Sequence, residues 1–182
     1  MNIFYLDNDV QTCAEMHNNS HCVKMILEYA QLLSTAHRVL DGTISTGFSQ
    51  SGRRKTVYTL ASNLDTALYS ATHVNHPSAV WVRQSDANYI WLCNLLVALC
   101  EEYTHRYGKT HKVQLDGLCY VLLWNVPKNI PHGPFTEPTP AMPDEVKIAG
   151  DSIASYRNYY NVSKTHLAKW KSRPVPEWLA TT

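Results

Sequence analysis

One row of ionisable side chains in the sequence is suited to proton transfer. Six polar residues follow one another at steps of three or four positions: His17, His21, Lys24, Glu28, Gln31 and Thr35. Such steps place them along one side of an α-helix, and mostly apolar residues flank them. We therefore expect this polar seam to face a cleft, since isolated buried charges are costly. Glu28 is its only carboxylate and could act as a general acid or base, assisted by His17, His21 and Lys24.

The seam also allows other interpretations. A solvent-exposed helix face that carries a surface network of His and Glu side chains would show the same spacing. His17 and His21, four residues apart, have the spacing of helical zinc ligands. The positive charge of Lys24 on the same seam would repel a bound cation, so we predict no metal. No cofactor is expected either.

A second cluster could bind a phosphate and a base. Arg83 is suited to clamping a phosphate, and Trp81 could stack on a base, with His76 close by in the sequence. The alternative for Trp81 is a place in the core.

A third cluster lies near the C-terminus. From Asp151 to Arg173 there are five Lys or Arg residues and one acid, interleaved with aromatic residues. Phosphate neutralisation combined with base stacking requires both kinds of side chain. The candidates for nucleic-acid contact are Arg157, Tyr159, Tyr160 and Lys164. A helix with a solvated basic face and an aromatic core face would look similar.

The elements that must position these residues are mostly helical. Residues 12–38 contain no Gly or Pro and predict one long helix. A second long helix is expected from Ser85 or Asp86 to about Tyr107, ended by Gly108. Shorter helices are expected in four places: from His76-Pro77, near residues 63–69, over residues 114–124, and from about residue 152 to 172.

The remaining segments predict irregular structure. Residues 43–72, rich in Ser, Thr and Gly, predict a long surface loop. Its basic run, residues 53–55, is interpreted as a solvated charge cluster, with a phosphate contact as the alternative. Residues 125–150 contain six prolines and predict an ordered strap. Residues 2–6 predict a short strand or an arm that buries its apolar side chains. The expected fold is all-α: a compact single-domain helical bundle over residues 1–182, with at most one short N-terminal strand.

Composition narrows the class of protein. The chain has 182 residues, 45% of them hydrophobic, and a net charge of +1, so binding of nucleic acid would need a local basic patch. Five cysteines without a C-x-x-C pair indicate reduced thiols. The N-terminal residues do not have the pattern of a signal peptide, and no apolar run is long enough to span a membrane.

Three blocks of the sequence resemble a largely uncharacterised family of small bacteriophage proteins, some of them labelled pyrimidine-dimer DNA glycosylase. The blocks are the start MNIFYLD, the segment HNNSHCVKMILE at residues 17–28, and the ending YRNYY with AKWKSR and PEW. The likeness covers nearly the whole chain. It implies a protein that works in the cytoplasm of an infected host cell.

A more distant likeness is to the phage-type pyrimidine-dimer glycosylase/lyase, a compact helical enzyme. In that enzyme a histidine precedes the catalytic glutamate by seven residues, as His21 precedes Glu28 here. The likeness implies that Glu28 is the catalytic carboxylate and that the tail with Tyr159, Tyr160 and Lys164 contacts DNA. That enzyme uses the amine of an N-terminal threonine, whereas Asn2 follows Met1 here.

The expected function is therefore that of a phage enzyme acting on DNA or a nucleotide, by cleaving an N-glycosidic bond with Glu28 as acid or base. Water, Lys24 and the N-terminal amine are the alternatives for the nucleophile. The rival functions are a base-modifying transferase and a non-catalytic module that binds nucleic acid or counters a host defence. The expected partner is DNA or a nucleotide, not a membrane; the oligomeric state is left open.

Overall fold

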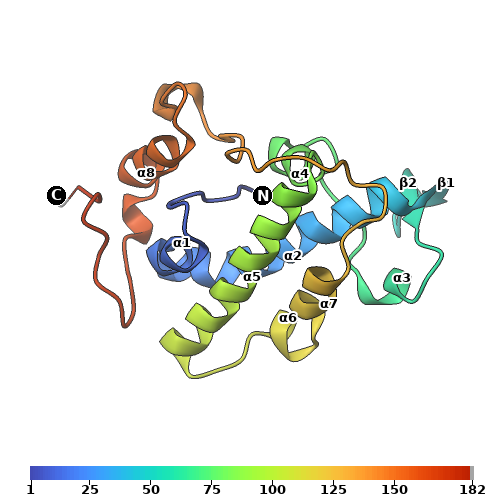
Figure 1. Ribbon diagram of the computed structural model, residues 1–182, viewed down its shortest axis with the longest axis horizontal. Helices are drawn as coiled ribbons and strands as arrows, with labels where there is room; N and C mark the ends of the chain where they lie inside the picture. The colour runs from blue at the N-terminus through green and yellow to red at the C-terminus, as the bar shows by residue number, and fades with distance from the viewer. Residues whose placement is uncertain (181–182) are drawn as a thin grey trace.

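The computed structural model describes residues 1–180, and two long helices form its centre. These are α2 (Asn19–Asp41) and α5 (Asp86–Tyr107), which pack against each other (Figure 1). Shorter helices surround the pair: α1 (Val10–Met16), α3 (Leu64–Ala67), α4 (Pro77–Val82), α6 (Lys112–Leu115), α7 (Leu118–Trp124) and α8 (Ser152–Ser163). Two single 3₁₀ turns complete the helical elements: η1 (Asp144–Val146) and η2 (Thr165–Leu167). The prediction of a mostly helical fold is confirmed.

The core is rich in aromatic residues and draws on almost every element. Its largest fully buried side chains include Tyr5, Tyr29, Trp81, Tyr89, Tyr156 and Tyr160. Each hydroxyl or indole N–H needs a partner when it is buried. Polar contacts therefore run through this core, and several of them reach the candidate site described below.

The ends of α5 follow from local signals. The Ser85 hydroxyl accepts a hydrogen bond from the Asn88 amide at the N-terminus. Gly108 ends the helix in the left-handed conformation, with φ of 63°. Pro77 in the first turn of α4 agrees equally well with prediction.

The single helix predicted over residues 12–38 is wrong, because two helices lie there. His17 is extended, with ψ of 132°, and Asn18 caps α2 by accepting a hydrogen bond from the His21 amide at 2.9 Å. The freed carbonyl of His17 accepts a hydrogen bond from Arg106 of α5 at 2.8 Å. The break is therefore stabilised by a side chain 89 residues away.

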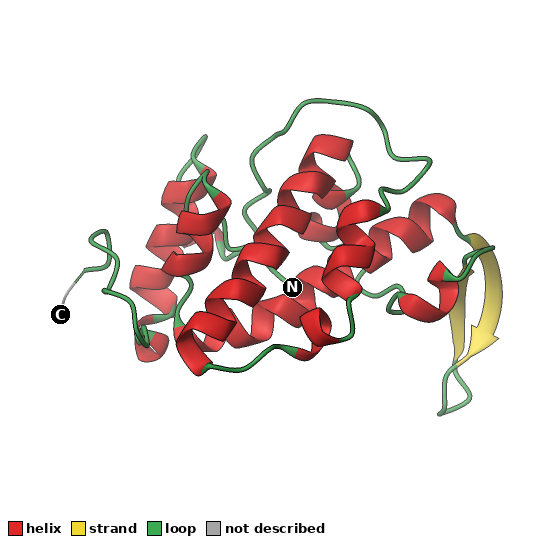
Figure 2. Cartoon of the chain, turned by 60° about the horizontal axis from the view of Figure 1, so that its bottom comes forward, coloured by secondary structure: helices red, strands yellow, loops and turns green. Residues whose placement is uncertain are grey.

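The loop predicted over residues 43–72 is also wrong in part. Strands β1 (Thr43–Phe48) and β2 (Arg54–Thr59) form an antiparallel hairpin that stands out from the helices (Figure 2). Its Thr, Ile and Val residues favour strands, and Ser and Gly form the turn between them. The helix predicted near residues 63–69 is present as α3.

Four further segments complete the comparison with prediction. Residues 125–150 form an irregular strap apart from η1, as their prolines predict. The helix predicted over residues 114–124 is divided by Gly117, at φ of 75°, into α6 and α7. The last helix ends at Ser163 and not near residue 172. Residues 2–6 form an extended arm, not a strand, and bury Ile3 and Tyr5 completely.

Candidate active site

A cavity of about 320 Å³ lies between the N-terminal arm, α2, the strap and α8. We call it the arm cavity. Five of the residues predicted as site residues line it: His21, Lys24, Glu28, Tyr159 and Lys164. The structure thus brings part of the polar seam together with part of the C-terminal cluster, from segments about 130 residues apart.

Glu28 holds two positive charges at the cavity. Its Oε1 lies 3.0 Å from Lys24 Nζ, and its Oε2 lies 3.4 Å from the α-amine of Met1. The Glu28 side chain is 13% exposed, whereas that of Lys24 is 68% exposed. The carboxylate is therefore partly withdrawn from water while one of its cations stays in solvent.

His21 is a buried member of the cavity lining, with 6% of its surface exposed. Its ring stacks on Phe4 with centroids 4.0 Å apart, and its Nδ1 lies 2.6 Å from the Tyr160 hydroxyl. Asn18 Oδ1 accepts from a backbone amide, so its Nδ2, 3.3 Å from Nδ1, must donate to the ring. This assigns the ring proton to Nε2. Burial lowers the pKa of His21 to about 3, with the positive charges of Lys164 and Lys24 acting in the same direction, so the imidazole is neutral at pH 7.

His17 lies outside the cavity lining, unlike its predicted place on the seam. It is fully buried: its Nδ1 donates to the Cys13 carbonyl at 2.7 Å, and its Nε2 accepts from the Tyr29 hydroxyl at 2.9 Å. Burial lowers its pKa to about 4. His17 therefore joins α1 to α2 as a neutral core residue.

Tyr159 and Lys164 form the opposite wall of the cavity. The Tyr159 ring is nearly parallel to that of Phe4, at 7° and 6.3 Å between centroids. Lys164 Nζ lies 4.8 Å from the centre of the Tyr159 ring. Two aromatic faces and an ammonium group thus occupy the space beside Glu28.

The other residues predicted from the C-terminal cluster support this wall from behind. Tyr160 is buried against His21, and burial raises the pKa of its hydroxyl well above 10.0. Arg157 donates to the Leu6 carbonyl at 2.9 Å and pairs with Asp7 at 3.3 Å. It ties the N-terminal arm to α8 and is not among the cavity residues.

The second predicted cluster serves the fold around α4. Both hydrogen bonds from Arg83 go to backbone carbonyls, those of Val74 and Ala79. Trp81 is 1% exposed and donates to Thr136, so no face of its indole is open for stacking on a base. Trp81 therefore has the place in the core that was its alternative, whereas Arg83 is half-buried and its contact with a phosphate stays a prediction.

His76 has a different position, close to the charges of the arm cavity. Its Nδ1 accepts a hydrogen bond from the Ser78 amide at 3.2 Å and so caps α4. Burial lowers the pKa of His76, the nearby α-amine of Met1 lowers it further, and Glu28 opposes both. His76 thus lies within electrostatic range of the Met1–Glu28 pair without lining the cavity.

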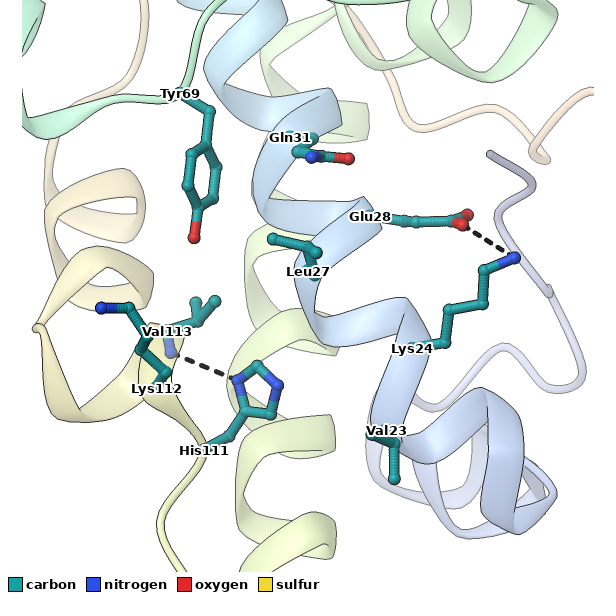
Figure 3. A pocket seen from close by; sticks show the side chains of 9 residues that line it. All are labelled: Val23, Lys24, Leu27, Glu28, Gln31, Tyr69, His111, Lys112 and Val113. Atoms are coloured by element: carbon teal, nitrogen blue, oxygen red, sulfur yellow. Dashed lines mark hydrogen bonds and ion pairs between the residues drawn. The ribbon is translucent and has the colours of Figure 1, made fainter.

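A second hollow, of about 450 Å³, lies on the other side of α2 (Figure 3). Leu27, Tyr69 and Lys112 are among its lining residues, and it shares Lys24 and Glu28 with the arm cavity. Leu27 is 41% exposed, so this apolar flank of the seam is open and not covered as predicted. Figure 3 shows Glu28 and Lys24 turned toward each other and away from Tyr69, so the charged groups belong to the arm cavity.

Sequence reasoning missed the residues that cover the arm cavity. They come from the arm and the strap: Met1, Asn2, Phe4, Ala141, Met142 and Pro143. The apolar arm predicted burial, but no local pattern indicated that it crosses α2 at Glu28. The arm's position depends on contacts such as the hydrogen bond from the Phe4 amide to the Tyr29 hydroxyl, 3.1 Å long.

Comparison of the chain with protein-family models, curated proteins and solved structures found no match. Within residues 1–180, no group of three or more His, Cys, Asp or Glu side chains is arranged to hold a metal ion. All five cysteines are free and buried. None of the helices that the structure describes has the length and apolar character needed to cross a bilayer.

Proposed function

We propose that this chain is an enzyme that cleaves an N-glycosidic bond in DNA or a nucleotide, with Glu28 as its acid–base group. The observation that supports this most directly is the Glu28 carboxylate between two amines, Lys24 Nζ at 3.0 Å and the Met1 α-amine at 3.4 Å. Breaking a bond to the anomeric carbon C1′ creates positive charge on the sugar. A carboxylate beside that carbon would stabilise the charge and accept a proton from the nucleophile.

An amine beside Glu28 would complete such a reaction. Glu28 first takes a proton from the ammonium group, which frees the nitrogen lone pair. The neutral amine then attacks C1′, the bond from C1′ to the base breaks, and the electron pair leaves with the base. Glu28 passes the proton to the departing base. The Met1 amine is the favoured nucleophile, because the Met1 side chain is 6% exposed whereas the Lys24 side chain is 68% exposed. A water molecule activated by Glu28 is the alternative.

The rest of the cavity suits a nucleotide. The Tyr159 ring offers an aromatic face, and Lys164 places an ammonium group where a phosphate would be neutralised. The Nε2–H of neutral His21 is a donor for a base or sugar oxygen. The volume of about 320 Å³ is at the lower end of the range for small-molecule sites, which is suited to one nucleoside unit.

The test is base release from a panel of oligonucleotides, each carrying one damaged or modified base. The wild type should release a free base from at least one of them, and Glu28→Gln should lower the rate by about a hundredfold or more. Glu101→Gln makes the same chemical change at an exposed position of α5 and should leave the rate unchanged. Binding of the oligonucleotide by Glu28→Gln should persist.

Borohydride reduction during turnover identifies the nucleophile. A covalent adduct mapped to residue 1 or to Lys24 would show which amine forms the imine, and turnover without an adduct would indicate water. Release of no base, combined with transfer of a group onto DNA, would indicate the modifying transferase. Tight binding without any turnover in wild type and Glu28→Gln alike would refute the enzymatic proposal in favour of a binding module.

A further inference from the structure

The hairpin β1–β2 is the part of the molecule that the catalytic proposal leaves unexplained. It extends beyond the C-terminal end of α2, away from the helical body (Figure 2). Every residue from 43 to 59 is exposed or half-buried, and none is buried. An isolated two-stranded ribbon is only marginally stable in water, and one that buries none of its residues gains little stability from packing. Stability therefore does not explain why the chain forms this hairpin.

The charge of the hairpin has one sign. Residues 42–64 contain three cations, Arg53, Arg54 and Lys55, and no Asp or Glu. In the part of the chain that the structure describes, none of the three has an ion-pair partner. All three are exposed: Arg53 lies at the end of the turn, and Arg54 and Lys55 are the first two residues of β2. This is a local basic patch on a chain whose net charge is only +1.

Cross-strand pairing places apolar side chains beside these cations. Phe48 is paired with Arg54, and Ile44 is paired with Tyr58 two pairs further along the same face. Phe48 and Ile44 are 66% and 65% exposed. Lys55 projects from the opposite face, so cations are available on both sides of the ribbon.

The base of the ribbon is fixed, which gives it a defined direction. Arg38, near the end of α2, donates to the carbonyl of Tyr58 at 2.8 Å and pairs with Asp65 at 2.8 Å. The same guanidinium donates to the carbonyls of Tyr69, Asp65 and Leu68. The two strands therefore extend from a rigid anchor and not from a flexible tether.

We propose that this hairpin is a binding element for duplex nucleic acid, inserted into a groove with its cations on the flanking phosphates. A two-stranded ribbon has the width that a DNA major groove admits. Arg53, Arg54 and Lys55 would neutralise phosphates, while Phe48 would contact base edges. Exposed strand edges could also pair with another protein, but unpaired cations without acids favour the polyanion.

The base of the hairpin lies at the end of α2, beyond Glu28. Asp41, at that end, follows Glu28 by 13 residues. At the rise of an α-helix this is about 20 Å, and the cations of the ribbon lie at its far end. The binding role itself does not depend on the chemistry proposed for Glu28.

The experiment measures binding of the full chain to an undamaged, fluorescently labelled duplex of about 24 base pairs, between about 50 and 200 mM salt. The triple variant Arg53→Ala, Arg54→Ala, Lys55→Ala should bind about tenfold to a hundredfold more weakly, with a log–log salt slope shallower by about 2 to 3. Substituting Lys109, Lys128 and Lys147 by Ala removes the same charge from exposed positions elsewhere and should change the affinity less than about threefold.

Two further variants make the result specific. Arg53→Lys with Arg54→Lys keeps the charge and should retain most of the affinity. Glu28→Gln should bind like the wild type, so failure of the catalytic proposal would not affect this measurement. Equal weakening in the two triple variants, or no binding by the wild type, would overturn the proposal. Loss of self-association in the hairpin variant with unchanged DNA affinity would likewise overturn it, in favour of a protein contact.

Discussion

The Nδ1 atom of His21 lies 2.6 Å from the hydroxyl oxygen of Tyr160, which follows it by 139 residues. This contact joins α2 to α8 at the inner wall of the arm cavity. It also fixes the tautomer of His21, because an Nδ1 that accepts a hydrogen bond leaves the ring proton on Nε2.

Tyr160→Phe should lower the free energy of unfolding by about 1–3 kcal/mol, because the buried Nδ1 of His21 loses its shorter partner. Urea unfolding measures the change. Tyr159→Phe removes a hydroxyl from the neighbouring, half-buried residue and should change stability by less than about 0.5 kcal/mol. Similar losses in the two variants would show that the contact with His21 contributes nothing special.

Stability should fall below neutral pH because of two buried histidines. The pKa of His17 is lowered to about 4 and that of His21 to about 3, mainly by burial, whereas the unfolded value is 6.5. Between about pH 6.5 and 4 the unfolded chain binds protons that the folded chain does not. Each histidine should therefore remove about 1.4 kcal/mol of stability per pH unit as the pH falls through this range.

Urea unfolding at about pH 7.5, 6 and 5 tests this expectation. His21→Gln should reduce the slope of stability against pH by about half if the two histidines dominate it. Imidazole NMR resonances give an independent measure, since neither ring should titrate above about pH 5. Titration of either ring near its ordinary value would contradict the assignment of both as neutral.

Glu102 is the centre of a buried ion cluster formed with Arg106 and Arg173. Its carboxylate accepts hydrogen bonds from Arg106 at 2.6 Å and from Arg173 at 2.8 Å, and the Glu102 and Arg106 side chains are fully buried. Burial raises the pKa of Glu102, and the bonds from Arg173 and Arg106 outweigh it, so the pKa is lowered overall.

Glu102→Gln should lower the free energy of unfolding by about 3–5 kcal/mol, because it leaves a buried guanidinium without its counter-charge. Glu101→Gln, at the adjacent exposed position, should change it by less than about 0.5 kcal/mol. Thermal unfolding monitored by circular dichroism compares the two. A Glu102 variant as stable as the Glu101 control would mean that the cluster contributes no net stability.

Arg38→Lys should loosen the base of the hairpin. A lysine cannot replace five hydrogen bonds from one guanidinium to Tyr58, Asp65, Leu68 and Tyr69. We expect a loss of about 2–4 kcal/mol in unfolding free energy and faster proteolysis within residues 49–53. Arg54→Lys, at an exposed site, should alter neither property. Unchanged proteolysis in Arg38→Lys would show that the ribbon is held by other contacts.

Local chemistry in the sequence determined those elements whose signals lie within a few residues. Ser85 and Gly108 set the two ends of α5, and Pro77 starts α4. The prolines of the strap prevent a helix there, because each one restricts its local backbone and lacks an N–H donor. The seam spacing likewise placed Lys24 and Glu28 one turn apart on α2, where they form an ion pair.

Only the tertiary structure decided the break between α1 and α2 at His17. There, Arg106 from α5 donates a hydrogen bond to the His17 carbonyl, which has no partner within a helix. It also decided that the N-terminal arm brings Met1 to Glu28, and that Tyr159 and Lys164 face them across one cavity. The hairpin had β-branched residues as a sequence signal, but its anchor on Arg38 joins residues up to 31 positions apart. Contacts between distant segments depend on packing and burial, which residue types and spacing do not specify.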